Sequence, residues 1–67
     1  MKEFTLNGHA IKVLDCMIED GEANCFEEGI DFSVDGEFVG ALIGWSTECS
    51  VDELIELVEL NFKSKIV

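Results

Sequence analysis

The sequence predicts an α+β fold, a four-stranded antiparallel β-meander with one C-terminal α-helix packed on one face. Three dipeptides have the composition of two-residue hairpin turns, because both central residues of such a turn need positive φ. They are Asn7-Gly8, Asp20-Gly21 and Asp35-Gly36. Apolar and polar residues alternate around these turns, as in half-buried strands, and the spacing then becomes helical. A chain of 67 residues suffices for one domain, which we expect to span residues 1–67.

The first turn predicts strands over about residues 2–6 and 9–19. Pairing outward from this turn gives the register Leu6–His9, Thr5–Ala10, Phe4–Ile11, Glu3–Lys12 and Lys2–Val13. Apolar side chains then share one face, and Glu3 opposite Lys12 forms a favourable cross-strand pair on the other. Further along, the apolar pattern shifts by one residue, to Leu14, Cys16 and Ile18. This shift predicts a β-bulge near residue 14.

The second and third turns predict strands over about residues 22–34 and 37–45. The second turn places Cys16 opposite Cys25, whereas the segment 27–29 breaks the alternation as either a bulge or a turn. The third turn places Phe32 opposite Val39 and Ile30 opposite Ala41. The apolar positions of the fourth strand are Val39, Ala41, Ile43 and Trp45, and they predict that this strand lies near the centre of the sheet.

The segment from about residue 50 to 63 predicts the helix. Ser50 and Glu53 have the spacing of a capping box, in which the hydroxyl accepts an amide proton and the carboxylate reaches back. The stripe predicted to be buried consists of Val51, Leu54, Ile55, Val58 and Phe62. The opposite face carries acidic side chains for two turns, with no cation before Lys63.

Charge is the strongest functional signal in the sequence. Four Lys and fifteen Asp or Glu residues give a net charge of −11 at pH 7. Nucleic-acid binding requires cations, and anionic membranes repel such a surface, so the expected partner is a basic protein surface or a cation. No apolar run approaches a membrane span, and the N-terminal residues show no signal-peptide pattern. We therefore expect a cytoplasmic location.

Neither metal binding nor catalysis is indicated. Asp31, Ser33, Asp35 and Gly36 match the opening of an EF-hand loop, but the twelfth position is Leu42 instead of Glu, so a hairpin turn is favoured. The three cysteines, Cys16, Cys25 and Cys49, lack the spacing of a zinc site and are expected to be reduced thiols. His9 is the single histidine, and no nucleophile motif surrounds it. We expect neither a cofactor nor enzymatic activity.

The acidic residues are the candidate binding site. On the helix they are Asp52, Glu53, Glu56 and Glu59, and a competing acidic patch comprises Glu22, Glu27, Glu28 and Asp31. Self-repulsion among so many carboxylates destabilises a small domain, which points to a compensating function. Asp52, Glu56 and Glu59 follow one another along the helix with rises of about 6 and about 4.5 Å. DNA phosphates repeat on a similar scale, so the row predicts nucleic-acid mimicry toward a Lys/Arg-lined groove.

In size, charge and compactness the chain resembles the small acidic inhibitors of phages and mobile elements, which include anti-CRISPR and DNA-mimic anti-restriction proteins. That resemblance implies a non-enzymatic inhibitor that covers the DNA-binding surface of a nuclease or a CRISPR effector.

The segments "DGEFVGALIGW" and "SVDELIELVELNF" are also similar in layout to HicB-type antitoxins, although the proline-containing segment of that family is absent. This second resemblance implies a module that neutralises a basic ribonuclease toxin. A structural or adaptor subunit is the third alternative. An exposed edge strand, or the helix flank at Leu57 and Leu60, offers a surface for a second copy.

Overall fold

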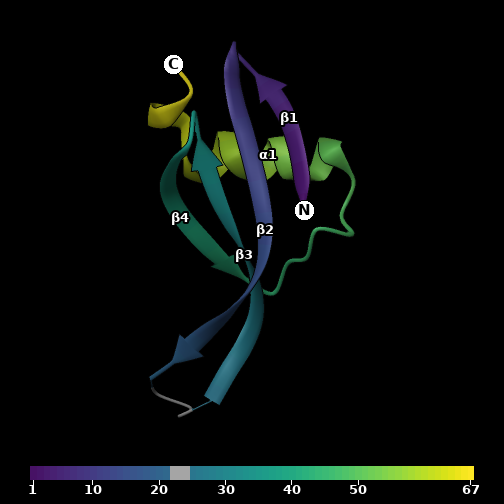
Figure 1. The fold of residues 1–67 in the computed structure, drawn as a ribbon, viewed down its shortest axis with the longest axis vertical. Coiled ribbons are helices and arrows are strands. Elements are labelled where there is room, and N and C mark those ends of the chain that lie inside the picture. Colours follow the sequence, from purple (N-terminus) through teal and green to yellow (C-terminus); the bar gives the residue numbers. More distant parts are fainter. Residues whose placement is uncertain (22–24) are drawn as a thin grey trace.

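The computed structural model describes residues 1–21 and 25–67 and confirms the predicted α+β meander (Figure 1). The strands form one antiparallel sheet in the order β1-β2-β3-β4. Their bounds are β1 Lys2–Leu6, β2 His9–Asp20, β3 Cys25–Val34 and β4 Glu37–Ile43. The helix α1 follows at Val51–Asn61, and a 3₁₀ turn, η1, at Lys63–Lys65.

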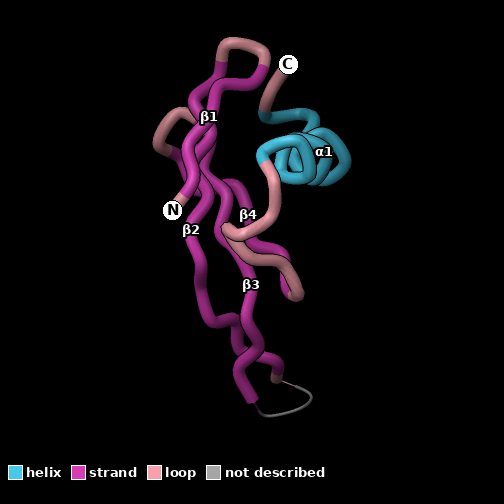
Figure 2. Tube along the Cα trace, turned by 90° about the vertical axis from the view of Figure 1, so that its right-hand side faces the viewer, coloured by secondary structure: helices cyan, strands magenta, loops and turns pink. Residues whose placement is uncertain are grey.

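The helix covers one face of the sheet, which we call the inner face, while the outer face has no covering layer in the described chain (Figure 2). The buried core between the two layers consists of Ile11, Val13, Ile30, Phe32, Val34, Leu54, Leu57, Val58 and Ile66. Residues from both central strands and from α1 contribute to it, and Ile66 joins it from beyond η1. Burial of this apolar surface is the main term that holds helix and sheet together.

The predicted register of the first hairpin is confirmed at every pair, from Leu6–His9 to Lys2–Val13. Asn7 and Gly8 both have positive φ, at 52° and 81°, as the turn requires. Glu3 lies opposite Lys12, as expected. In the described part of the chain, however, the salt bridge within 4 Å joins His9 and Asp35 instead.

The predicted bulge near residue 14 is wrong, because β2 pairs with β3 without interruption from Ile11 to Asp20. Alternation along this regular strand places Ile11 and Val13 on the inner face and Leu14, Cys16 and Ile18 on the outer face. The apolar pattern therefore shifts because β2 carries apolar side chains on both faces of the sheet, and not because an extra residue is inserted. The segment 27–29 is likewise regular strand, neither a bulge nor a turn.

The second hairpin has a longer connection than predicted. Asp20 pairs with Cys25, so Cys16 lies opposite Gly29 and not opposite Cys25. Relative to a two-residue turn at Asp20-Gly21, the register moves by four residues. Because four is an even number, every side chain keeps its predicted face. The first part of the predicted third strand, residues 22–24, lies outside the described residues.

The third hairpin follows its predicted register at Val34–Glu37 and Ser33–Phe38 and then shifts by one. Phe32 pairs with Gly40, and Ile30 with Leu42, so the predicted pairs with Val39 and Ala41 are wrong. Val39 is the extra residue of a β-bulge in β4. The bulge places Gly40 beneath the Phe62 ring, where an added Cβ would approach that ring to 2.6 Å.

The fourth strand ends two residues earlier than predicted, and it forms an edge of the sheet instead of its centre. Gly44, with φ of 87°, turns the chain away from the sheet. Trp45 consequently lies in the loop before α1, with 36% of its surface exposed. In a meander the first and last strands are necessarily the edges, which leaves β2 and β3 as the central pair.

The helix begins as predicted and ends slightly earlier. The Glu53 amide donates to the Ser50 hydroxyl at 3.2 Å, which is the N-cap bond of the predicted capping box, and that hydroxyl donates to the Glu53 carboxylate at 3.3 Å. Leu57 and Leu60 were expected to form an exposed apolar flank. Leu57 is buried, with 8% of its surface exposed, so Leu60, at 74%, is the exposed member of this pair. None of the helices in the described chain has the length and apolar character needed to cross a membrane.

The two central strands extend well beyond their neighbours (Figures 1 and 2). The first strand pairs with β2 only as far as Val13, and the ladder between β3 and β4 starts at Gly29. Residues 14–20 and 25–28 therefore form a projecting two-stranded ribbon, which we call the arm. Its exposed apolar side chains include Leu14, Met17 and Phe26.

Candidate functional site

The outer side of α1 presents the predicted row of carboxylates. Asp52, Glu53, Glu56 and Glu59 are all exposed, and none belongs to a salt bridge within the described residues. The last turn of α1 contains no basic residue. The helix therefore shows a partner several carboxylates that form no ion pair within the described residues.

The two ends of this acidic row differ in their local stability. Asp52 and Glu53 lie in the first turn, where the helix dipole favours negative charge, and the Glu53 carboxylate also accepts the Ser50 hydroxyl. Glu56 and Glu59 lie further along the helix, nearer the end at which the dipole disfavours negative charge. Helix stability therefore accounts for the negative charges of Asp52 and Glu53 but not for those of Glu56 and Glu59.

The competing acidic patch is divided between two faces. Glu27 and Glu28 are exposed on the arm and Asp31 is half-buried, whereas Glu22 lies outside the described residues. Alternation in β3 places Glu27 and Asp31 on the outer face and Glu28 on the inner face. The described members of this patch therefore do not form one continuous surface.

The three cysteines are unpaired thiols. Cys16 is half-buried, Cys25 is exposed on the arm and Cys49 is half-buried before α1. Burial, together with the neighbouring Asp31 carboxylate, raises the pKa of Cys16 to about 11. Since the thiolate is the nucleophilic form, this thiol has little reactivity near neutral pH.

The EF-hand-like segment is a hairpin turn, as its sequence predicted. Asp35 and Gly36 have φ of 52° and 85°. The Asp35 carboxylate accepts the Ala10 amide at 2.9 Å and lies 2.6 Å from His9 Nδ1. His9 Nε2 is 3.2 Å from the Val67 carbonyl, so both ring nitrogens have partners. Within residues 1–21 and 25–67, no three His, Cys, Asp or Glu side chains are grouped so as to hold a metal ion.

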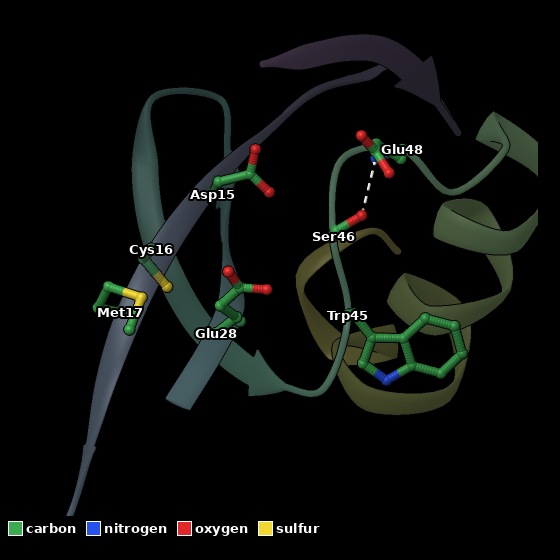
Figure 3. A pocket seen from close by; sticks show the side chains of 8 residues that line it. Asp15, Cys16, Met17, Glu28, Trp45, Ser46 and Glu48 are labelled. Carbon is green, nitrogen blue, oxygen red and sulfur yellow. Dashed lines mark hydrogen bonds between the residues drawn. The ribbon is translucent and has the colours of Figure 1, made fainter. Parts of the chain in front are cut away.

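A groove of about 620 Å³ separates the arm from the loop that leads to α1 (Figure 3). Its lining residues are Asp15, Cys16, Met17, Glu28 and Gly29 on the strands and Trp45, Ser46 and Glu48 on the loop. In Figure 3 the Asp15 and Glu28 side chains point toward the loop, and the Trp45 indole points away from these strands. The groove thus brings three carboxylates together, two of which, Asp15 and Glu48, were not predicted as site residues.

Asp15 holds the loop side of the groove in place. Its carboxylate accepts the Thr47 amide at 3.0 Å and the Thr47 hydroxyl at 2.7 Å. These two hydrogen bonds lower the pKa of Asp15. On the other side, the Gly44 amide donates to the Glu28 carbonyl at 2.9 Å. Both walls of the groove are therefore fixed by hydrogen bonds.

Comparison of the chain with protein-family models, with curated proteins and with solved structures finds no match.

Proposed function

We propose that this protein is a non-enzymatic acidic inhibitor that binds a basic, nucleic-acid-handling protein and covers its nucleic-acid-binding surface. A nuclease or a CRISPR effector is the intended class of target. The proposal rests on one observation, the exposed row of Asp52, Glu53, Glu56 and Glu59, which no described cation pairs. The inhibitor acts in the cytoplasm, which for a phage-encoded protein is that of the host cell.

A helix is a suitable scaffold for imitating a phosphate backbone because its side chains have fixed positions. Within the row, Asp52, Glu56 and Glu59 follow one another with rises of about 6 Å and about 4.5 Å along the helix axis. Phosphates of one DNA strand follow one another at about 3.4 Å along the duplex. A groove lined with Lys and Arg for nucleic acid can pair with either row of charges, since the contacts to phosphate carry no sequence information.

Several contacts hold the row in place. The Ser50 cap fixes the first turn, and Leu54, Leu57 and Val58 are buried against the sheet. At the other end, the Asn61 side chain donates to the Leu57 carbonyl at 2.9 Å. Binding therefore requires little ordering of the helix backbone, which reduces the entropic cost of association.

The test is capture of target proteins by the immobilised chain at low and at high salt, followed by competition with duplex DNA. We expect a nuclease or CRISPR complex to be retained at low salt, to be released by high salt, and to compete with DNA for the same surface. Retention of a single small ribonuclease would favour a HicB-like antitoxin. Retention of a neutral partner that high salt does not release would contradict nucleic-acid mimicry and favour an adaptor role.

A further inference from the structure

The arm has an open strand edge beside the groove. Gly44 turns the chain out of the sheet after β4, and the β3–β4 ladder reaches no further than the bond from the Gly44 amide to the Glu28 carbonyl. Beyond that bond, no described strand pairs with residues 25–28 on this side. In antiparallel strands, residues two apart direct their amide and carbonyl to the same side, so those of Phe26 point toward this edge.

Such an edge is a template for another strand. Native proteins commonly close an edge with proline, with lysine or with a covering segment. The described residues of the arm contain neither proline nor lysine. An extended segment that added here would receive backbone hydrogen bonds at Phe26, as in other complexes formed by β-strand addition.

The groove provides room for the side chains of such a segment. Glu28 and Gly29 line it on the strand side, and Ser46 and Glu48 line it on the loop side. The volume of about 620 Å³ exceeds that of a single side chain. Because Asp15 fixes Thr47 by two hydrogen bonds, the space does not depend on rearrangement of the loop.

The chemistry of the groove selects the occupant. Asp15, Glu28 and Glu48 supply three carboxylates, and the lining includes no cation. Met17, 59% exposed, adds an apolar wall. A cationic head group on an apolar stem, as in arginine or lysine, matches both features. A second copy of this chain does not match, because it would bring like charges together at a net charge of −11 for each copy.

We propose that the open edge of β3 at residues 25–28 binds an extended, arginine- or lysine-bearing segment of the basic partner as an added strand, with its cations in the groove. The inference rests on the proposed function and names a second contact for the same partner. The outer side of α1 engages the nucleic-acid-binding surface, and the arm holds a flanking basic segment.

The probe is a short peptide of alternating arginine and threonine, added to the chain of residues 1–67 at low salt. The chain has one Trp and no Tyr, so emission from Trp45 beside the groove reports binding without interference. We expect the amides of Phe26 and Glu28 to become protected from hydrogen exchange. A matched peptide, methylated on the amides of one edge, retains its charge and should bind about tenfold more weakly, because it loses backbone hydrogen bonds.

Two variants of the chain complete the experiment. Glu28→Gln should weaken binding severalfold, whereas Glu37→Gln removes the same charge from an exposed position outside the groove and should have little effect. Equal binding of the two peptides, or equal effects of the two substitutions, would overturn the added strand and leave a diffuse attraction to acidic surface. That result would not affect the proposed function, which the capture and DNA-competition experiment tests separately.

Discussion

The imidazole of His9 and the carboxylate of Asp35 lie 2.6 Å apart and join the first and third hairpin turns at one end of the sheet. The last residues of the chain dock at the same place, because Asn7 donates to the Ile66 carbonyl and His9 Nε2 lies 3.2 Å from the Val67 carbonyl. Only a doubly protonated imidazole can donate to both acceptors.

This pair predicts a pH-dependent contribution to stability. The Asp35 carboxylate, and then the Val67 carbonyl, raise the pKa of His9. The stabilisation is therefore complete below the pKa of unfolded histidine and is lost as pH rises through the higher folded value. The pKa of Asp35 is lowered by His9 and by the Ala10 amide, so its contribution is lost as pH falls through that lowered value.

Thermal unfolding measured between about pH 5 and pH 8 should show this decline toward the alkaline end. The matched variant is His9→Gln, whose side chain does not titrate, and we expect its unfolding midpoint to change less over the same range. An NMR titration of His9 gives the direct readout. A folded-state pKa at or below that of free histidine would contradict the prediction.

Gly29 should tolerate no side chain. An added Cβ would lie 2.5 Å from the Leu42 carbonyl oxygen and 2.5 Å from Ile18 Cδ1. The Ile18 side chain can move, but the backbone of the paired strand cannot do so without disturbing the ladder. We expect Gly29→Ala to lower the free energy of unfolding by about 1–3 kcal/mol, the range typical of overpacking.

The control for this substitution is Gly21→Ala. An added Cβ at Gly21 meets nothing within 4 Å, and its φ is not positive. Chemical denaturation of the two variants should therefore separate steric crowding from the general effect of replacing glycine. Equal stability of the two variants would show that β3 and β4 can separate at this point without cost.

The N-terminal cap of α1 should contribute measurably to stability. Ser50→Ala removes the acceptor of the Glu53 amide and should cost about 1 kcal/mol, whereas Ser50→Gly should cost only a few tenths. The free energy of unfolding from urea titration measures both. An alanine variant as stable as the glycine variant would mean that solvent replaces the hydroxyl without loss.

The binding role of α1 can be separated from folding by reversing two charges. Glu56→Lys combined with Glu59→Lys would place like charges against a basic partner, at a cost of several kcal/mol in binding. Folding should persist or improve, because the substitutions reduce self-repulsion. Binding to the captured partner and the thermal midpoint are measured on the same preparation.

A second double variant, Glu3→Lys with Glu37→Lys, has the same net charge but changes exposed residues of β1 and β4. It should retain more binding than the α1 variant. If both variants bind equally well with their folds intact, α1 is not the binding surface, and the acids of the arm become the main candidates.

The elements predicted correctly from the sequence are those determined by residues that lie close together along the chain. The register of the first hairpin follows from Asn7-Gly8, and the start of α1 follows from the spacing of Ser50 and Glu53. The register shifts at Val39, and the shifted strand places Gly40 beneath Phe62, which is distant in sequence. No pattern within β4 indicates that contact.

The site residues, too, separate into those that local sequence patterns predict and those that depend on contacts distant in the sequence. The exposure of Glu56 and Glu59 could be inferred from helical periodicity alone. The groove could not be inferred, because Asp15 and Glu48 line one space only when β4 ends at Ile43 and Thr47 bonds to Asp15. The contact between His9 and Asp35 depends on a sheet register that the second turn did not predict correctly.

The open edge of the arm also has a consequence for how the protein behaves in concentrated solution. Its exposed strands, with Phe26 and Met17, could pair with the same strands of another molecule, and only mutual repulsion of the carboxylates opposes this. Acid removes that repulsion, and salt weakens it over distances beyond about 10 Å. Acidic or high-salt storage should therefore promote precipitation by edge-to-edge pairing, while the protein remains dispersed in dilute neutral buffer.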